Sequence, residues 1–311
     1  MGLSIIWTFI FYPEGVEEIA QDLAVIPSLI VNAYLVGNAQ SWVLVDSGTS
    51  GSERDIKQAS EARFGSGAKP NAIVLTHGHF DHVGSAKPLA ELWGVRVYAH
   101  RLELPYLTGR SAYPPLDHTA PGFFSALSRF FPASTADLRP HVDPIDSSRP
   151  FPNMNGWECI DTPGHTPGHL SFYRRSDGTL LAGDALTTMN LDSFIGTLTQ
   201  QPELRRPPVP ATTDWQQARQ SVQKLASLRP KVIAAGHGKP MTDAAEQLRN
   251  LADHFPIPTH GRYAGEPARA NESGVTYLPP APPDRTPKII TGLAAGAALA
   301  AVGALIVRKR R

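Results

Sequence analysis

Residues 76–84 read Thr-His-Gly-His-Phe-Asp-His-Val-Gly. The segment follows the apolar run Ala72-Ile73-Val74-Leu75, which is typical of a short buried strand. Side chains alternate in direction along an extended chain, so His77 and His79 point the same way, while the carboxylate and the third imidazole open the following turn. Imidazole and carboxylate ligands without a thiolate suit zinc, iron or manganese at a site with open positions. The segment therefore predicts a metal site at the end of a strand.

Further ligand types occur at other predicted strand ends, each beside a glycine. His165 follows Thr162-Pro163-Gly164, Asp184 follows Gly183, and His237 follows Gly236. Because strand ends can converge at one edge of a sheet, we expect these side chains to join the histidine-rich segment.

Strands and helices alternate along most of the chain, which argues for an α/β layer structure. Hydrophobic patterning predicts strands at 3–11, 23–30, 31–36, 41–45, 72–75, 95–99, 157–160, 170–173, 179–182 and 231–235. It predicts helices at 52–64, 86–93, 214–228 and 243–255. Asp177-Gly178 lies between two of the strands and predicts a hairpin.

The composition limits the possible partners. The chain has 311 residues, a formal net charge of +1, 41% hydrophobic and 18% charged residues. These values support a sizeable core and indicate no nucleic-acid partner. Cys159 is the single cysteine, so an internal disulfide and a cysteine-rich zinc module are both excluded. We expect Cys159 to be a small buried residue beside a strand.

The regular alternation stops between residues 101 and 155. This stretch is rich in proline and aromatic residues, and 123–131 could form a short amphipathic helix. Long irregular loops are uncommon in compact domains unless they are functional. We expect a lid over the metal cleft that offers apolar contacts to a substrate. The alternative is a surface insertion that packs on its own neighbours.

Taken together, the motifs resemble the metallo-β-lactamase-fold hydrolases. The resemblance covers about the first 255 residues and rests on Thr76–His82, Thr162–His165, Gly183-Asp184 and Gly236-His237 in this order. It implies an αββα metallo-β-lactamase-like sandwich as the catalytic domain, residues 1–255, with the metals in a cleft along one sheet edge.

The resemblance also implies a ligand set for each of two divalent ions, with zinc expected and iron or manganese as alternatives. One ion would be held by His77, His79 and His165, and the other by Asp81, His82 and His237, with Asp184 bridging the two. Asp46 resembles the aspartate that holds a metal-bound imidazole from behind in this family.

The expected activity is hydrolysis of an ester, thioester or lactone by a hydroxide bound between the two ions. Asp184 would hold both ions and Asp81 would orient the hydroxide, so both are expected to be catalytic. Alternatives are a phosphodiesterase or nuclease of the same fold, and a metal-binding protein without turnover. A small-molecule substrate is expected in each enzymatic case except the nuclease.

Departures from known branches leave the substrate open. Thiolate-containing metallo-β-lactamases place cysteine where Asp184 stands. Hydroxyacylglutathione hydrolases and persulfide dioxygenases usually follow Gly-Asp with Gly-Cys-Gly-Arg, whereas this chain has Ala185-Leu-Thr-Thr188. Quorum-quenching lactonases tend to place tyrosine shortly after the bridging aspartate, where this chain has Thr187.

The C-terminal part differs in composition from the rest. Residues 256–288 are rich in proline and predict an extended linker. Residues 289–307 carry no charge and are followed by Arg308-Lys-Arg-Arg311, which predicts a transmembrane anchor over 289–311. The spacing of Gly292 and Gly296 could let two such helices pair as a dimer. We expect the catalytic domain to be tethered to the membrane on the cytoplasmic side.

Overall fold

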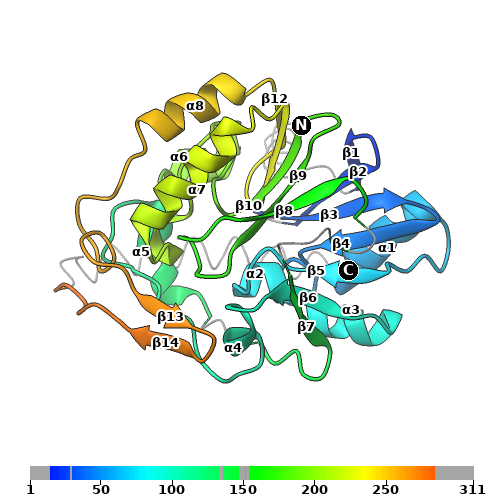
Figure 1. Cartoon of the computed structure of the whole chain (residues 1–311), viewed down its shortest axis with the longest axis horizontal. Coiled ribbons are helices and arrows are strands. Elements are labelled where there is room, and N and C mark those ends of the chain that lie inside the picture. The colour runs from blue at the N-terminus through cyan, green and yellow to red at the C-terminus, as the bar shows by residue number, and fades with distance from the viewer. Residues whose placement is uncertain (1–14, 29, 133–135, 147–150, 152–153, 284–311) are drawn as a thin grey trace, which may run out of the picture.

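Two β-sheets packed face to face form the centre of the fold, and helices cover both outer faces (Figure 1). The computed structural model describes residues 15–28, 30–132, 136–146, 151 and 154–283. Within these ranges the layers are helix, sheet, sheet and helix, as the αββα prediction requires. The sandwich prediction is therefore confirmed.

The first sheet has seven strands in chain order. They are β1 (Glu17–Ala20), β2 (Leu23–Ser28), β3 (Val31–Asn38), β4 (Ser41–Val45), β5 (Ala72–Val74), β6 (Val97–His100) and β7 (Val142–Ile145). The strands from β1 to β4 pair antiparallel, and those from β4 to β7 pair parallel. Parallel pairing places the carboxyl ends of β4 and β5 at one edge, where the histidine-rich segment begins.

The second sheet has five strands in the order β12-β11-β10-β9-β8. Their bounds are β8 (Trp157–Asp161), β9 (Leu170–Arg174), β10 (Thr179–Gly183), β11 (Val232–Ala235) and β12 (Met241–Thr242). β9 and β10 form the predicted hairpin around Asp177-Gly178, and β10 pairs parallel with β11. The ends of β10 and β11 therefore carry Asp184 and His237 to the same edge.

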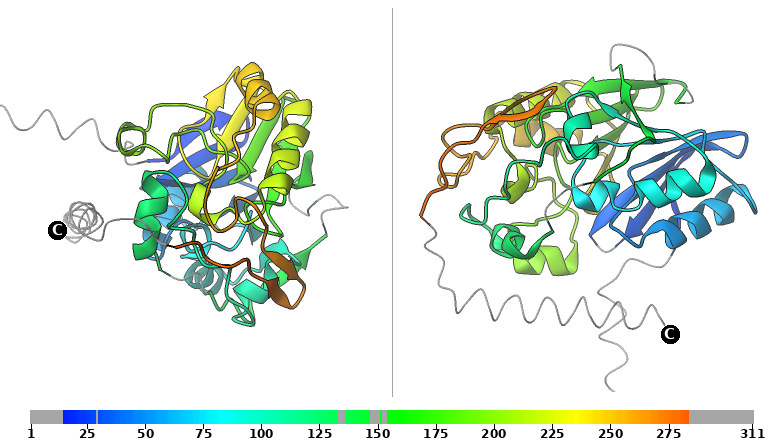
Figure 2. Two further views of the ribbon diagram at one scale, coloured as in Figure 1. Left: turned by 90° about the vertical axis from the view of Figure 1, so that its left-hand side faces the viewer. Right: turned by 90° about the horizontal axis from the view of Figure 1, so that it is seen from below.

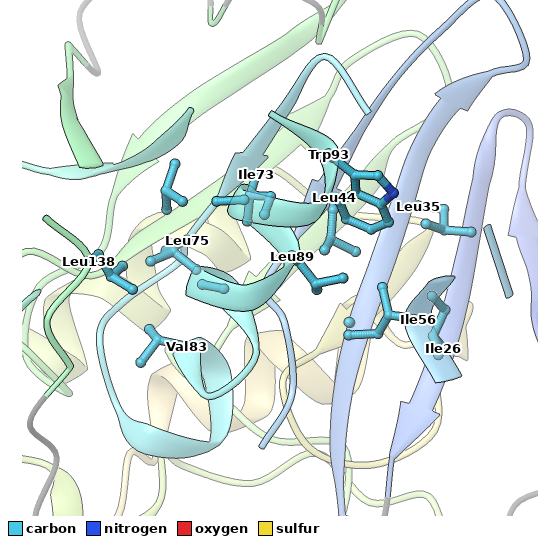
Figure 3. Close-up of a cluster of buried hydrophobic side chains, with 14 of the residues drawn as sticks. Ile26, Leu35, Leu44, Ile56, Ile73, Leu75, Val83, Leu89, Trp93 and Leu138 are labelled. Carbon is cyan, nitrogen blue, oxygen red and sulfur yellow. The ribbon is translucent and has the colours of Figure 1, made fainter. Parts of the chain in front are cut away.

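Alternating side chains divide the core into three layers, as a period of two requires. On β4, Val43 and Val45 face the second sheet, while Trp42 and Leu44 face α1 (Glu53–Phe64) and α3 (Ala86–Trp93) (Figure 3). On β10, Leu181 lies between the sheets. Its neighbours Leu180 and Ala182 face the opposite way and pack with α7 (Trp215–Ser227) and α8 (Ala245–Asp253).

The structure corrects three sequence predictions. A short helix, α2 (Phe80–Val83), lies inside the histidine-rich segment, where only a turn was expected. Residues 101–155 are more regular than expected: they contain α4 (Leu104–Leu107), α5 (Phe123–Leu127), the 3₁₀ helix η2 (Ser128–Phe130) and strand β7. Residues from the predicted linker fold onto the domain, because β13 (Arg269–Asn271) and β14 (Gly274–Tyr277) form a hairpin and Tyr263 is buried in the second-sheet core.

Two further predictions fall outside the described residues. These are the N-terminal strand at 3–11 and the membrane anchor at 289–311. Across the portion of the chain that is described, no helix combines the length and apolar character that crossing a bilayer demands.

Gly84 shows why a glycine ends the histidine-rich segment. Its backbone N–H donates to Gly48 O at 2.9 Å, and a Cβ at this position would lie 2.2 Å from Ser50 N. The turn after α2 therefore packs directly on the backbone that follows β4.

Replacing Gly84 with alanine should overpack this contact and lower the free energy of unfolding by about 1–3 kcal/mol. Chemical denaturation of the metal-free protein measures the change. Gly265→Ala is the matched control, because nothing lies within 4 Å of a Cβ built there. Equal stability of the two variants would contradict the close approach at Gly84.

Candidate metal centre

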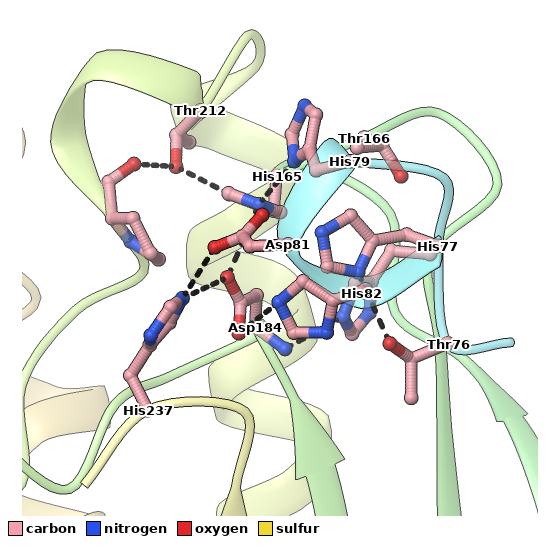
Figure 4. A network of polar contacts seen from close by, with 12 residues as sticks. Thr76, His77, His79, Asp81, His82, His165, Thr166, Asp184, Thr212 and His237 are labelled. Atoms are coloured by element: carbon pink, nitrogen blue, oxygen red, sulfur yellow. Dashed lines mark hydrogen bonds and ion pairs between the residues drawn. The ribbon is translucent and has the colours of Figure 1, made fainter. Parts of the chain in front are cut away.

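All the predicted ligand side chains meet at one edge of the two sheets (Figure 4). The first sheet contributes His77, His79, Asp81 and His82 after β5, and the second contributes His165, Asp184 and His237. Three groups of three have candidate ligand atoms that all lie within 4.8 Å of one another. They are His77/His79/His165, His77/His82/Asp184 and Asp81/His82/His237. The first and third groups coincide with the two predicted ligand sets.

Asp184 lies between the two sets. Its Oδ2 is 3.5 Å from His165 Nε2 and 3.1 Å from His237 Nε2, and its Oδ1 is 3.5 Å from His82 Nε2. Asp81 Oδ2 approaches the same His237 nitrogen at 3.6 Å. A single buried carboxylate thus contacts imidazoles of both predicted sets, which is the position a bridging ligand would need.

Hydrogen bonds behind the imidazoles fix which ring nitrogen faces inward. His237 Nδ1 lies 2.7 Å from Ile30 O, so this nitrogen donates, and in the neutral ring the lone pair is on Nε2. His165 Nδ1 lies 3.1 Å from Thr212 Oγ1, whose own proton is donated to Pro208 O at 2.8 Å. His165 Nδ1 is therefore also a donor, which leaves the lone pair on Nε2, the atom that lies 3.0 Å from Nδ1 of the fellow predicted ligand His79.

Asp46 plays the same part for the first sheet. Its carboxylate accepts from His82 Nδ1 at 2.9 Å, and from both the backbone N–H and the hydroxyl of Thr76 at 2.8 Å. Because the Thr76 proton goes to Asp46, His77 Nδ1 must donate to the Thr76 oxygen 3.0 Å away. The Nε2 atoms of both histidines then point into the site. Asp46 thus contacts the imidazole of a predicted ligand from behind, as the sequence resemblance implies.

The donor set fits a cation pair. His77 Nε2, His82 Nε2 and Asp184 Oδ1 are buried without a hydrogen-bond partner among the described residues. Buried polar atoms are rarely left unpaired, and a pair of bound divalent ions would satisfy all three. These orphaned atoms point to the same conclusion as the ligand chemistry.

Burial and neighbouring charges divide the histidines into two classes. Burial lowers the pKa of His77 and His165 well below the usual value and that of His79 to about 4, so these rings are neutral at pH 7. Burial also disfavours charge on His82 and His237, but Asp184 outweighs it and raises both pKa values. One set is thus ready to bind a metal, whereas the other must first lose protons.

His169 holds the backbone of Asp184, the residue predicted to bridge the two ions. It is buried, and its Nε2 accepts from Asp184 N at 2.8 Å. Its Nδ1 lies 2.8 Å from Thr162 Oγ1, which is itself 2.9 Å from Ser171 Oγ, and that hydroxyl donates to Ala182 O. The spacing of His169, four residues after His165 and directly before the next predicted strand, predicts a structural or supporting residue rather than a ligand.

Glu103 is the site residue that sequence reasoning missed. It is completely buried and accepts four hydrogen bonds. One comes from Gly78 N in the loop of His77 and His79, one from the Tyr113 hydroxyl, and two from Thr166 and Gly168 in the loop of His165. Glu103 therefore ties together the loops that carry His77, His79 and His165. Nothing local marks it, because all its partners except Tyr113 are distant in sequence.

A small cavity opens onto these side chains. His79, Asp81, His165, Asp184 and His237 line its polar part. The apolar walls are Phe80, Leu116, Phe124, Phe131, Pro208, Pro210 and Ala211. Three of these come from 101–155, so this segment does supply apolar contacts at the site; the lid itself stays a prediction.

Comparison with known proteins agrees with this architecture. Residues 26–237 match the family model described as the Metallo-beta-lactamase superfamily. A relative from Bacillus subtilis (strain 168), named probable metallo-hydrolase YflN, is 40% identical over 217 residues, which cover 68% of this chain and 82% of the relative.

Solved structures give the same picture. A di-iron-bound form of TTHA1623 is 28% identical, with a TM-score of 0.51, and covers 72% of this chain and 95% of its own. The B3 metallo-beta-lactamase BLEG-1 is 26% identical, with a TM-score of 0.51, and covers 76% of this chain and 100% of its own.

Because the two classes of histidine differ in pKa, we expect protons to compete with the two ions to different extents. His82 and His237 have raised pKa values in the metal-free protein, so their ion must displace protons, and its affinity should fall as pH drops from 8 to 6. The loss should approach about tenfold per pH unit for each proton displaced. The first ion should bind with little change over this range. Calorimetric titration of metal-free protein at pH 6, 7 and 8 measures both affinities. Parallel pH dependence of the two ions would contradict the assignment.

Glu103→Gln should loosen both ligand loops. The amide group replaces one oxygen, so two buried donors lose their acceptor and stability should fall by about 2–4 kcal/mol. The affinity of the first ion should fall by about 10–100-fold. Thermal unfolding and metal titration measure the two effects. The control is Glu272→Gln, since the side chain of Glu272 is 67% exposed. Normal metal affinity in a folded Glu103→Gln protein would show that the hydrogen bonds of Glu103 do not position the ligand loops.

Proposed function

The chain belongs to the metallo-beta-lactamase superfamily, and from this premise we propose that it is a metal-dependent hydrolase of a neutral ester, thioester or lactone. The observation that carries the proposal is the convergence of the histidines and aspartates at the polar end of a cavity with apolar walls. The relative from Bacillus subtilis named a probable metallo-hydrolase supports the reaction class.

In this proposal the chain holds two divalent ions, zinc or alternatively iron or manganese. His77, His79 and His165 hold one, Asp81, His82 and His237 hold the other, and Asp184 contacts both. When bound, the ions would supply Lewis acidity and lower the pKa of water toward neutrality. The di-iron-bound relative is the reason to keep iron among the alternatives.

The protein's own groups supply orientation and exclusion of water. Asp46, Thr212 and the Ile30 carbonyl hold the imidazoles in fixed tautomers, which removes the cost of reorienting them during reaction. Phe124 and Phe131 cover one side of the cavity and would pack against the acyl part of a substrate. In this proposal Asp81, which lines the cavity, orients the attacking hydroxide.

The character of the walls favours a neutral substrate over a phosphodiester. No lysine or arginine lines the cavity as far as the chain is described. Phosphodiester and nucleic-acid sites usually place such cations near the phosphates. The phosphodiesterase alternative therefore has less support than hydrolysis of a carbonyl compound.

We also propose attachment to a membrane through residues 289–311, with the catalytic domain on the cytoplasmic side and the possibility of pairing through the same segment. The support is the uncharged apolar composition of 289–307 and the basic residues that follow.

Asp184→Ala should remove most of the second ion and lower turnover by more than about 100-fold, because both sets lose a shared contact. Metal analysis and a panel of p-nitrophenyl esters, thioesters, lactones and bis-p-nitrophenyl phosphate measure the outcome. Asp253→Ala, at an exposed position on α8, is the control.

The same panel decides between the candidate functions. Turnover of the phosphodiester alone would replace the carbonyl hydrolase with a phosphodiesterase. Full metal loading with no turnover across the panel would favour a metal-binding protein. Unchanged metal content and turnover in Asp184→Ala would reject the shared role of this aspartate.

A further inference from the structure

Helix α6 (Phe194–Thr199) presents its apolar side chains to solvent. None of its residues is buried, and Phe194, Ile195 and Leu198 are 58%, 69% and 42% exposed. Positions i, i+1 and i+4 lie on one side of a helix, so these side chains form one apolar face. A surface helix normally turns such a face to the core, whereas α6 turns it outward.

The neighbouring segment enlarges this face. The ring of Phe123, at the start of α5, lies 5.2 Å from that of Phe194, and Phe130 in η2 is 48% exposed. We call Phe123, Phe194, Ile195 and Leu198 the outer patch. The residues that follow Phe123 and Phe130 in sequence, Phe124 and Phe131, line the cavity. The segment from α5 to η2 thus separates the outer patch from the candidate metal centre.

The course of the chain indicates what the outer patch faces. The described chain ends at Pro283, and Figure 2 shows this end (orange) leaving the domain on the side of α5 (teal). Five residues, 284–288, connect Pro283 to the uncharged segment that begins at Ile289, a distance of at most about 20 Å along an extended chain. If that segment enters a bilayer, the face near Pro283 is held close to the lipid.

We propose that the outer patch docks on the surface of a lipid bilayer. The proposal rests on the membrane attachment proposed above and goes beyond it, because it names the face of the catalytic domain that meets the lipid. Exposed phenylalanine, isoleucine and leucine side chains enter the interface between headgroups and acyl chains. The patch residues carry no charge, so this contact is insensitive to salt, in contrast to the attraction between the basic C-terminal residues and anionic headgroups.

The test uses the full chain in vesicles of phosphatidylcholine and phosphatidylglycerol. Cys159→Ser removes the native thiol, and an environment-sensitive fluorophore is attached at Ile195→Cys. The matched control carries the fluorophore at Leu92→Cys, because Leu92 is 56% exposed on α3, away from the outer patch. Vesicles should shift the emission of the probe at 195 to shorter wavelength and allow quenching by a lipid-borne quencher, also in 0.5 M salt (roughly a 4 Å screening length). The probe at 92 should respond to neither.

A second variant separates docking from anchoring. With Phe194→Ser and Leu198→Ser added, the protein should still sediment with vesicles through its C-terminal segment, but the emission shift at 195 should be lost. Circular dichroism and turnover of a soluble ester report whether the domain remains folded, and the probe readout does not depend on hydrolysis.

Four results would overturn the proposal. If the probe at 195 stays as accessible to water as the probe at 92 when vesicles are present, the chain is anchored but the outer patch does not dock on the bilayer. Shielding of 195 without vesicles that rises with protein concentration identifies a second copy as the occupant. Shielding that does not depend on concentration identifies the chain's own C-terminal segment. Failure of the full chain to bind vesicles removes both the docking and the attachment, while the proposed hydrolase activity is judged separately by the substrate panel.

Discussion

The site depends on keeping one carboxylate, Asp184, charged in the interior of the protein. Burial alone would raise its pKa, but His237 and His82 outweigh burial and hold the pKa well below the usual value. Glycine at position 236 leaves the space that the Asp184 side chain occupies, because a Cβ there would lie 2.1 Å from Asp184 Oδ1. A buried charge of this kind is tolerated only with compensating partners, which explains why imidazole nitrogens of His82, His165 and His237 lie within 3.5 Å of the carboxylate oxygens.

The same edge also joins the two sheets. Asn32 on β3 donates its side-chain amide to the carbonyls of Ala235 and Gly238, and the Tyr34 hydroxyl donates to Ala235 O at 2.6 Å. From the other direction, Leu170 N on β9 donates to Thr76 O at 2.9 Å. These bonds cross between sheets next to His237 and His77. The ligands from the first sheet are therefore positioned relative to those from the second by hydrogen bonds between the sheets, independently of any ion.

Local pattern was sufficient for much of this architecture. Short apolar runs bounded by turn residues located β2 to β5 and β8 to β11, and glycine beside a ligand type marked His165, Asp184 and His237. What could not be found was decided by distant partners. In the sequence, Glu103 is one carboxylate in a proline-rich stretch. Its role follows only from the four donors that the fold brings to it. β7 is strand only because it completes the parallel edge beside β6, and β13–β14 folds where proline content suggested an extended chain.

The position of Glu103 has a consequence for how this fold can diversify. The segment that follows β6 contains two parts, which make different contacts with the residues of the candidate metal centre. Its beginning, through Tyr113, is bonded into both ligand loops, so exchange of this part between relatives would have to preserve the Glu103–Tyr113 pair. The part that carries Phe124 and Phe131 shapes the wall and meets the ligand segments through its rings, which lie 6.3 Å from the ring of His237 and 5.8 Å from that of Phe80, respectively. Substrate preference can therefore evolve, or be redesigned, by grafting downstream of Tyr113 while the metal scaffold is inherited unchanged.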